Sequence, residues 1–280
     1  MKKVKTGTKA ALYVIHFVLI MFVFLPLIFA FSSSFRPMAE IYKYISPLSI
    51  KTFIPQEFTL EAYKEIFING GYGRALLNSL FVAFSTVVLG VVFNGMAGYA
   101  FAKYEFPCKN ILFVLVLLSY MVPFELLSIN LYSMMIDIGW MDSYLALIIP
   151  CVPNGMIIFL FRQFYMSFPD NLIEAARIDG MGDVGIFFKI VMPNSKAVCI
   201  SAALVQFVLQ WESFLWPVLV TRSKDMYTIQ IALSNFSTQY TKYWNQIFAG
   251  SLIAFLLPVS IILPLQKFYA AGLTTSGIKE

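Results

Sequence analysis

Charged residues are scarce in this sequence, and their scarcity excludes most soluble folds. Only 12% of the 280 residues are charged and 59% are hydrophobic, whereas a soluble domain has about 25% charged and about 45–50% apolar residues. The apolar residues form runs of about 20, the length that lets a helix cross roughly 30 Å of hydrocarbon. The composition therefore predicts an all-α integral membrane protein.

Metal ligands and paired cysteines are equally scarce. The three cysteines, Cys108, Cys151 and Cys199, are far apart in the sequence, and His16 is the single histidine. A structural metal site needs about four clustered ligands, and a redox pair needs closely spaced cysteines. We expect no metal and no cofactor in this chain, and cysteines that pack as small apolar residues.

Six apolar runs have the length of membrane spans, and an even number places both termini on one side. The first run follows a lysine-rich amino terminus (1–10) and is longer than a signal-peptide core, so we expect it to be retained as a helix. It opens a single membrane domain, 11–270, which precedes a short tail, 271–280. The predicted spans lie near 11–31, 76–102, 111–134, 143–161, 197–220 and 247–266.

Lysine and arginine are denser in the amino terminus, the tail and the loops on the same side as the termini than in the opposite loops. Positive residues are enriched on the cytoplasmic side, so both termini are predicted to be cytoplasmic. The net charge of +5 therefore concerns topology and gives no reason to expect nucleic-acid binding.

The longest predicted cytoplasmic loop, 162–196, has the pattern of two short helices. Pro169 and Asp170 suit a helix start, and Gly180 suits a left-handed stop. A second helix is predicted from about Asp183 to 191, with Pro193 opening the next span. The loop is therefore expected to form a helical elbow that can transmit motion from a soluble partner.

The motif of this elbow resembles a known one. Glu-Ala-Ala at 174–176 is followed after three residues by Gly180, then after nine by Ile190, and Met-Pro ends it at 192–193. This spacing resembles the EAA loop of binding-protein-dependent ABC importers, with Met192 in place of the usual leucine. The string 174–180 is similar to the carbohydrate-uptake, maltose-type permeases, and the chain looks closest to the smaller of their two permeases.

The resemblance implies a mechanism and a set of partners. A second permease would pair with this chain around one pathway, and an extracytoplasmic solute-binding protein would deliver a carbohydrate to a bacterial or archaeal cell membrane. Two ATP-binding subunits would bind ATP and Mg, because this chain has no phosphate loop. The residues expected to couple the permease to an ATP-binding subunit are Glu174, Ala175, Ala176, Asp179 and Gly180.

Polar side chains inside the predicted spans are candidates for the pathway, because charged and polar groups in a membrane usually face the bundle interior. Gln206 and Gln210 could bond sugar hydroxyls or, equally, neighbouring helices. Trp211 could stack on a sugar. Two departures from the family pattern, Glu212 in place of asparagine and Asn130 in place of proline, lie where the pathway is expected.

Two other functions fit parts of the sequence. An ion-coupled secondary transporter could use Glu125 and Glu212 as a proton relay, although it would have no need of the elbow. A membrane scaffold could recruit a soluble ATPase without passing solute. An intramembrane enzyme would need a catalytic constellation, which one histidine without a paired acidic motif does not supply.

Overall fold

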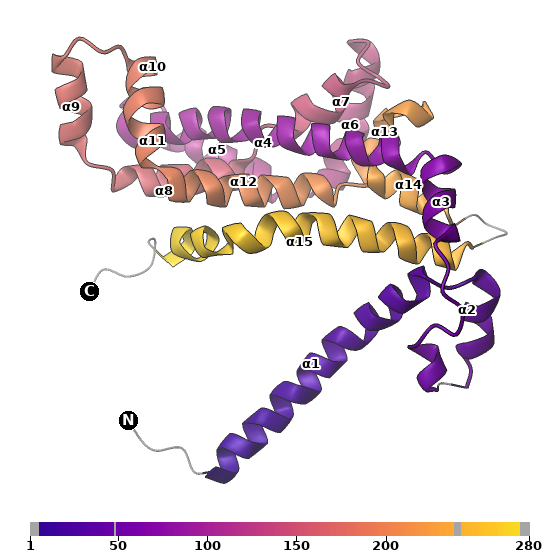
Figure 1. The fold of residues 1–280 in the computed structure, drawn as a ribbon. Helices are drawn as coiled ribbons and strands as arrows, with labels where there is room; N and C mark the ends of the chain where they lie inside the picture. Colours follow the sequence, from indigo (N-terminus) through magenta and orange to yellow (C-terminus); the bar gives the residue numbers. More distant parts are fainter. Residues whose placement is uncertain (1–5, 48, 238–241, 275–280) are drawn as a thin grey trace. The chain divides into compact units, whose positions relative to one another are not determined.

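The computed structural model describes residues 6–47, 49–237 and 242–274. The regular secondary structure of this part is helical, apart from a single antiparallel bridge between Ser237 and Lys242 (Figure 1). Residues 1–5 and 275–280, parts of the predicted cytoplasmic ends, lie outside the described residues. Two compact units are present. One joins the residues up to 73 with 232–256, and the other joins 74–231 with the residues from 257 onward.

Three helices are long and apolar enough to cross a membrane, judged by length and composition. They coincide with the predicted spans near 11–31, 76–102 and 247–266. They are α1 (Thr6–Ser34), α4 (Tyr72–Lys103) and α15 (Trp244–Thr274).

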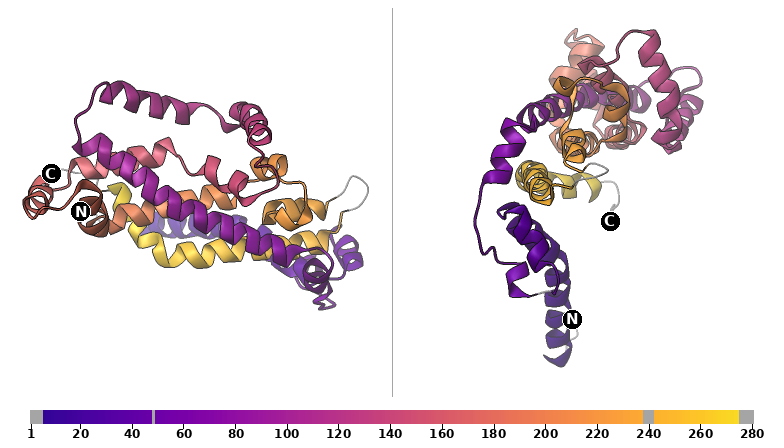
Figure 2. Two further views of the ribbon diagram at one scale, coloured as in Figure 1. Left: turned by 90° about the horizontal axis from the view of Figure 1, so that it is seen from above. Right: turned by 90° about the vertical axis from the view of Figure 1, so that its right-hand side faces the viewer.

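The predicted span 111–134 is two helices. α5 (Lys109–Met121) and α6 (Phe124–Asp137) meet at 98°, and Figure 2 shows the turn. Val122 has an extended backbone (φ −73°, ψ 123°), as expected for a residue whose α conformation is disfavoured by the proline that follows. Pro123 therefore ends α5 instead of merely kinking a continuous helix.

The remaining two runs are also interrupted. The run 143–161 contains α7 (Tyr144–Ile148), η2 (Ile149–Cys151) and α8 (Gly155–Met166), with a bend of 45°. The run 197–220 contains α12 (Lys196–Trp211) and α13 (Leu215–Val220), which are separated at Glu212. The third bent pair joins the helical segment 183–194 with α12 at 88°, and does not include α13. The number of spans stays a prediction: in the described residues it is six only if each bent pair is one span.

Short helices complete the first unit and the connections of the second. In the first unit the buried Arg36 donates to the carbonyls of Lys51 (3.0 Å) and Thr52 (2.9 Å) and lies 3.5 Å from the Glu40 carboxylate, which fixes the segment after α1. The short elements there and beyond are α2 (Met38–Tyr44), η1 (Ile50–Thr52), α3 (Glu61–Ile68), η4 (Lys224–Met226) and α14 (Ile229–Asn235).

The core of the second unit forms where α4, α8 and α12 cross. A Cβ on Gly98 of α4 would lie 2.5 Å from the Cβ of Phe161 in α8, so only glycine permits this approach. Gly90, two turns earlier, faces the side chain of Gln206 on α12. Tight crossings of this kind rest on small residues, as is usual between membrane helices.

α4 also carries polar side chains that bond distant segments of the second unit. Near its start, Asn78 donates to the carbonyls of Asp225 (2.7 Å) and Tyr227 (2.9 Å), and Ser79 accepts the backbone N–H of Ile229 (2.8 Å). At mid-helix, Asn94 bonds the break before α8. α4 is thereby fastened both to the loop after α13 and to the broken helix α7–α8.

Candidate functional site

The elbow begins with α9 (Asp170–Ile178), whose ends follow from local sequence. Pro169 precedes the helix, and Asp170 places a carboxylate in its first turn, where the helix dipole favours negative charge. At the other end, Met181 N–H bonds the Ala176 carbonyl (2.9 Å) and Gly180 N–H bonds the Arg177 carbonyl (3.0 Å). With φ +78° at Gly180, this is a Schellman C-cap. The predicted start and the left-handed stop are confirmed.

The second half of the elbow is longer than predicted. α10 (Asp183–Ile186), a π-helical turn (η3, Phe187–Val191) and α11 (Met192–Asn194) form one helical segment, which meets α12 at 88°. The prediction that this helix ends near 191 and that Pro193 opens the next span was wrong.

Side chains explain why Pro193 is tolerated inside the segment. Proline cannot donate a backbone bond, and the bend leaves nearby carbonyls open. The Asn194 amide donates to the Ile190 carbonyl and the Ser195 hydroxyl donates to the Val191 carbonyl, both at 2.7 Å. The bend therefore falls after Asn194, and α12 begins at Lys196.

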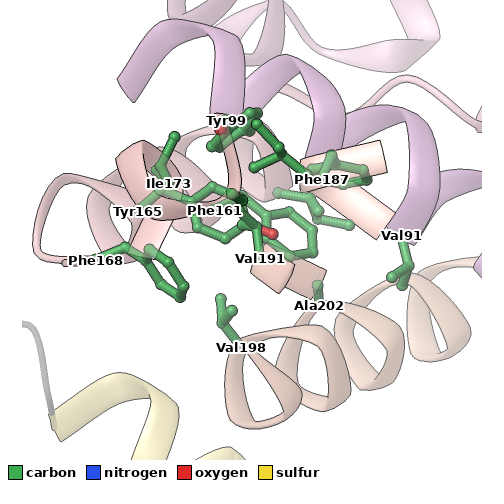
Figure 3. Close-up of a cluster of buried hydrophobic side chains, with 13 residues drawn as sticks. Val91, Tyr99, Phe161, Tyr165, Phe168, Ile173, Phe187, Val191, Val198 and Ala202 are labelled. Atoms are coloured by element: carbon green, nitrogen blue, oxygen red, sulfur yellow. The ribbon is translucent and has the colours of Figure 1, made fainter. Parts of the chain in front are cut away.

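α9 has a buried face and an exposed face. Ile173 and Ala176 are buried in a cluster with aromatic side chains of α4 and α8 (Figure 3). On the opposite side Ile178 is 86% exposed, and at the edge of the buried face Leu172 is 44% exposed. Of the predicted coupling residues, Glu174, Ala175, Asp179 and Gly180 are exposed and Ala176 is buried.

A pocket of about 420 Å³ lies between α9 and the ends of α4 and α8, beside the contact made by Ile173 and Ala176. Glu174 lines it together with two cations, Lys103 and Arg177. Both cations already have carboxylate partners: Lys103 Nζ is 2.6 Å from Asp170, and Arg177 is 3.3 Å from Asp183. Among the described residues Glu174 has no ion pair.

Gln206, a predicted pathway residue, bonds a neighbouring helix. Its side chain is buried, and its amide donates to the Cys151 carbonyl at 2.7 Å. Beside it, Asn94 donates to the Val152 carbonyl (2.9 Å) and accepts from Asn154 N–H (3.0 Å). Together they satisfy backbone groups that the break before α8 leaves open, as broken membrane helices require.

The other pathway candidates differ in exposure. Trp211 is buried at the end of α12, and its carbonyl accepts a bond from Gln230 (3.2 Å). Gln210 is half-buried, and Glu212, the residue after α12, is exposed. Asn130 is exposed on a different helix, α6. The structure thus brings the glutamines and Trp211 to one helix, and Asn130 to another.

Two residues of the elbow's surroundings were not singled out in the sequence. Lys103 ends α4 and donates to the Phe168 carbonyl (2.7 Å) as well as to Asp170. Tyr104, the next residue, places its ring 5.8 Å from the Arg177 guanidinium. The sequence identifies Lys103 only as one of the positive charges predicted to be cytoplasmic. Its partner, Asp170, is too far away along the chain for a local pattern to join them.

These features define the class: an all-α membrane protein in which an ordered helical elbow joins two apolar segments. The family described as "Binding-protein-dependent transport system inner membrane component" matches residues 87–271. The chain belongs to this family of inner-membrane permease subunits. The resemblance drawn from the elbow motif is thereby confirmed.

Similar proteins cover the whole chain. The arabinooligosaccharides transport system permease protein AraQ of Halalkalibacterium halodurans is 36% identical over 281 aligned positions, which span 100% of both chains. AraQ of Bacillus subtilis is 36% identical over 88% of this chain and 87% of its own length. The sn-glycerol-3-phosphate transport system permease protein UgpE of Escherichia coli O1:K1 is 31% identical over 90% of each.

A solved structure agrees with the fold. A bacterial ABC transporter involved in the import of the acidic polysaccharide alginate contains a chain that matches with a TM-score of 0.79 and 18% identity, over 96% of this chain and 99% of that one. At this identity the likeness concerns the fold alone. It confirms the predicted all-α permease fold.

Proposed function

We propose that this chain is one permease subunit of an ABC importer for a carbohydrate, and that α9 is its docking helix for a separate ATP-binding subunit. Family membership supports the role in transport, and the two-faced α9 is the observation that carries the docking role. The helix is anchored by Ile173 and Ala176, while Ile178 and Leu172 leave an apolar surface uncovered. An uncovered apolar surface on an otherwise ordered elbow is typical of a protein interface.

The charges of the elbow indicate what kind of side chain meets it. Glu174 lines the pocket next to cations that already have partners, so a lysine or arginine from the docked subunit would complete the pocket. Ala175 is exposed and has a small side chain, which lets a partner backbone approach α9 closely. ATP and Mg bind to that partner, since this sequence has no phosphate loop.

The remaining partners follow from the family and from charge. A second permease completes the pathway, and a solute-binding protein delivers the solute from outside. Both termini and the elbow face the cytoplasm of a bacterial or archaeal cell, as the distribution of lysine and arginine favours. Among the pathway candidates, the exposed Glu212 and Asn130 remain free to meet solute or the second permease, and Gln206 holds the break before α8.

The carbohydrate class rests on the relatives. Those that cover the chain at 36% identity are named for arabinooligosaccharides, so we propose an oligosaccharide as the solute. The 31% identity to a permease named for sn-glycerol-3-phosphate gives a second candidate, a phosphorylated polyol.

Reconstitution tests both parts of the proposal. This chain is purified from its native membrane with whatever subunits remain bound, and uptake of labelled arabino-oligosaccharide and of sn-glycerol-3-phosphate is measured in proteoliposomes with and without ATP. We expect an ATP-binding subunit and a second permease to co-purify, and ATP-dependent uptake of the oligosaccharide. Solute movement by the isolated chain driven by an ion gradient would contradict the proposal and favour a secondary transporter.

A further inference from the structure

α9 is tied to the end of α4 at its own first turn. Lys103, the last residue of α4, donates to the Phe168 carbonyl at 2.7 Å and to the Asp170 carboxylate at 2.6 Å. The side chain of Lys103 is only 9% exposed, while that of Asp170 is 72% exposed. The ammonium is thus a buried anchor that belongs to α4 and holds the start of α9.

A second tie lies at the other end of α9. The Arg177 guanidinium lies 5.8 Å from the Tyr104 ring centre and 3.3 Å from the Asp183 carboxylate. Tyr104 directly follows α4, and its ring packs edge-on against that of Tyr99 within the helix. Both ends of α9 are therefore attached to the last residues of α4 and to the residue that follows it.

Between the two ties, Ile173 and Ala176 of α9 are buried in a cluster that also contains Tyr99 of α4, and a pocket lies beside this contact. The pocket of about 420 Å³ is lined by Ala102 and Lys103 of α4 on one side and by Ile173 and Glu174 of α9 on the other. A displacement of α9 therefore reaches α4 through this packing and through the two ties at the ends of α9. Of the two ties, that of Lys103 is made of charge-assisted hydrogen bonds, which are stronger and more directional than apolar packing, so we take it as the one that positions α9 against α4.

α4 can carry such a displacement across the membrane. It is an uninterrupted helix of 32 residues, roughly 48 Å at 1.5 Å per residue, whereas the segments on either side of the elbow are bent by 45° and 88°. Its mid-section holds the break before α8 through Asn94, and its start holds the loop after α13 through Asn78 and Ser79.

We infer that α4 is the lever that transmits movement of the docking helix to the outer face, and that Lys103 is the positioning residue that engages it. The inference rests on the proposed function, because it takes α9 as the point where the ATP-binding subunit acts. Movement of α9 can reach α8 and α12 directly, because these helices flank the elbow along the chain. The inference adds α4, a helix outside the elbow motif, as a further element that transmits this movement.

The test uses the assembled transporter and four variants. Lys103→Met removes both bonds, Lys103→Arg retains a donor for them, and Asp170→Asn weakens one bond from an exposed position. Lys109→Gln is the matched control, because Lys109 is also a cytoplasmic lysine in an ion pair (2.9 Å to Glu105) but its partner lies in the same loop. Co-purification of the ATP-binding subunit, ATP hydrolysis and uptake are measured for each.

We expect Lys103→Met to keep the ATP-binding subunit and its hydrolysis while uptake per ATP falls about tenfold, a usual size for coupling between sites. Asp170→Asn should show a smaller loss in the same direction, and Lys103→Arg should restore most of the coupling. In a background without the native cysteines, a cysteine at Leu77, exposed near the start of α4, should change its labelling rate with ATP in the parent protein and not in Lys103→Met.

Two results would overturn the inference. One is that Lys103→Met and Asp170→Asn match Lys109→Gln in uptake per ATP. The other is that Lys103→Met loses the ATP-binding subunit, which would make Lys103 part of the docking surface. Failure of the proposed function would look different from failure of this inference. In that case the parent protein itself, like every variant, would show no bound ATP-binding subunit and no ATP-dependent uptake.

Discussion

The glycine corner of the elbow gives a quantitative prediction. Gly180 has φ +78°, and a Cβ added to it would meet no atom within 4 Å. The cost of Gly180→Ala is therefore purely that of the left-handed backbone, about 1–2 kcal/mol for a residue with a Cβ. Such a cost changes the population of the intact corner by a factor of roughly 5–30.

The corner has its own reporter and its own control. The amide of Met181 bonds the Ala176 carbonyl across the corner, so its hydrogen exchange should be roughly 5–30 times faster in Gly180→Ala. Gly180→Asn should be milder, because asparagine tolerates this conformation. Gly182 lies in the same loop with φ −73° and equally open space, so Gly182→Ala should exchange like the parent.

Uptake should follow the same order as the exchange of Met181. If the corner positions α9 for docking, Gly180→Ala should reduce uptake more than Gly180→Asn, and Gly182→Ala should leave it unchanged. Equal exchange in Gly180→Ala and Gly182→Ala would refute the backbone argument. Faster exchange with normal uptake would instead refute the role of the corner in docking.

Three further predictions concern the rest of the second unit. Asn94→Leu removes two hydrogen bonds to the break before α8 and should lower the free energy of unfolding in detergent by about 1–3 kcal/mol. This loss would be measured as a lower melting temperature. An unchanged melting temperature would show that other contacts hold the break. Glu212→Gln should keep much of the uptake and Glu212→Ala should not, if the exposed side chain binds sugar hydroxyls; full uptake in both would remove Glu212 from the pathway. The pKa of Asp142 is lowered, chiefly because its carboxylate accepts the backbone N–H of Arg222 and also that of Ser223. The stability that these bonds contribute is therefore complete above the ordinary aspartate pKa of about 3.9. It is lost as the pH falls through the lower pKa that Asp142 has in the folded protein. A spin label at position 224 should become mobile over that acidic range in the parent protein, whereas in Asp142→Asn its mobility should not follow the pH there.

The sequence by itself determined the class, the elbow and the family. Runs of apolar residues long enough to cross a membrane are expected to form helices, because in the membrane every backbone polar group must be hydrogen-bonded within its own segment. The ends of α9 were equally readable, since Asp170 and Gly180 act through the backbone next to them. The motif at 174–193 predicted the family because its residues and spacing can be recognised within one short stretch of sequence.

What the sequence could not show depends on contacts between distant residues. The run 111–134 reads as one span, but the turn of 98° within it depends on how α5 packs against α8 and α6 against α13. Gln206 reads equally as a sugar ligand or a structural residue, and only the position of the Cys151 carbonyl, 2.7 Å away, distinguishes them. Pro193 reads as a helix start, yet side chains of Asn194 and Ser195 satisfy the carbonyls around it.

The same reason hides Lys103 in the sequence. Its partners, Phe168 and Asp170, are about 65 residues away along the chain, and nothing in the local pattern joins them. Tertiary packing brings the end of α4 next to the start of α9, so that Lys103 bonds both the Phe168 carbonyl and the Asp170 carboxylate. Local sequence determines which segments are helical, and long-range packing decides which helix a displacement of α9 can move.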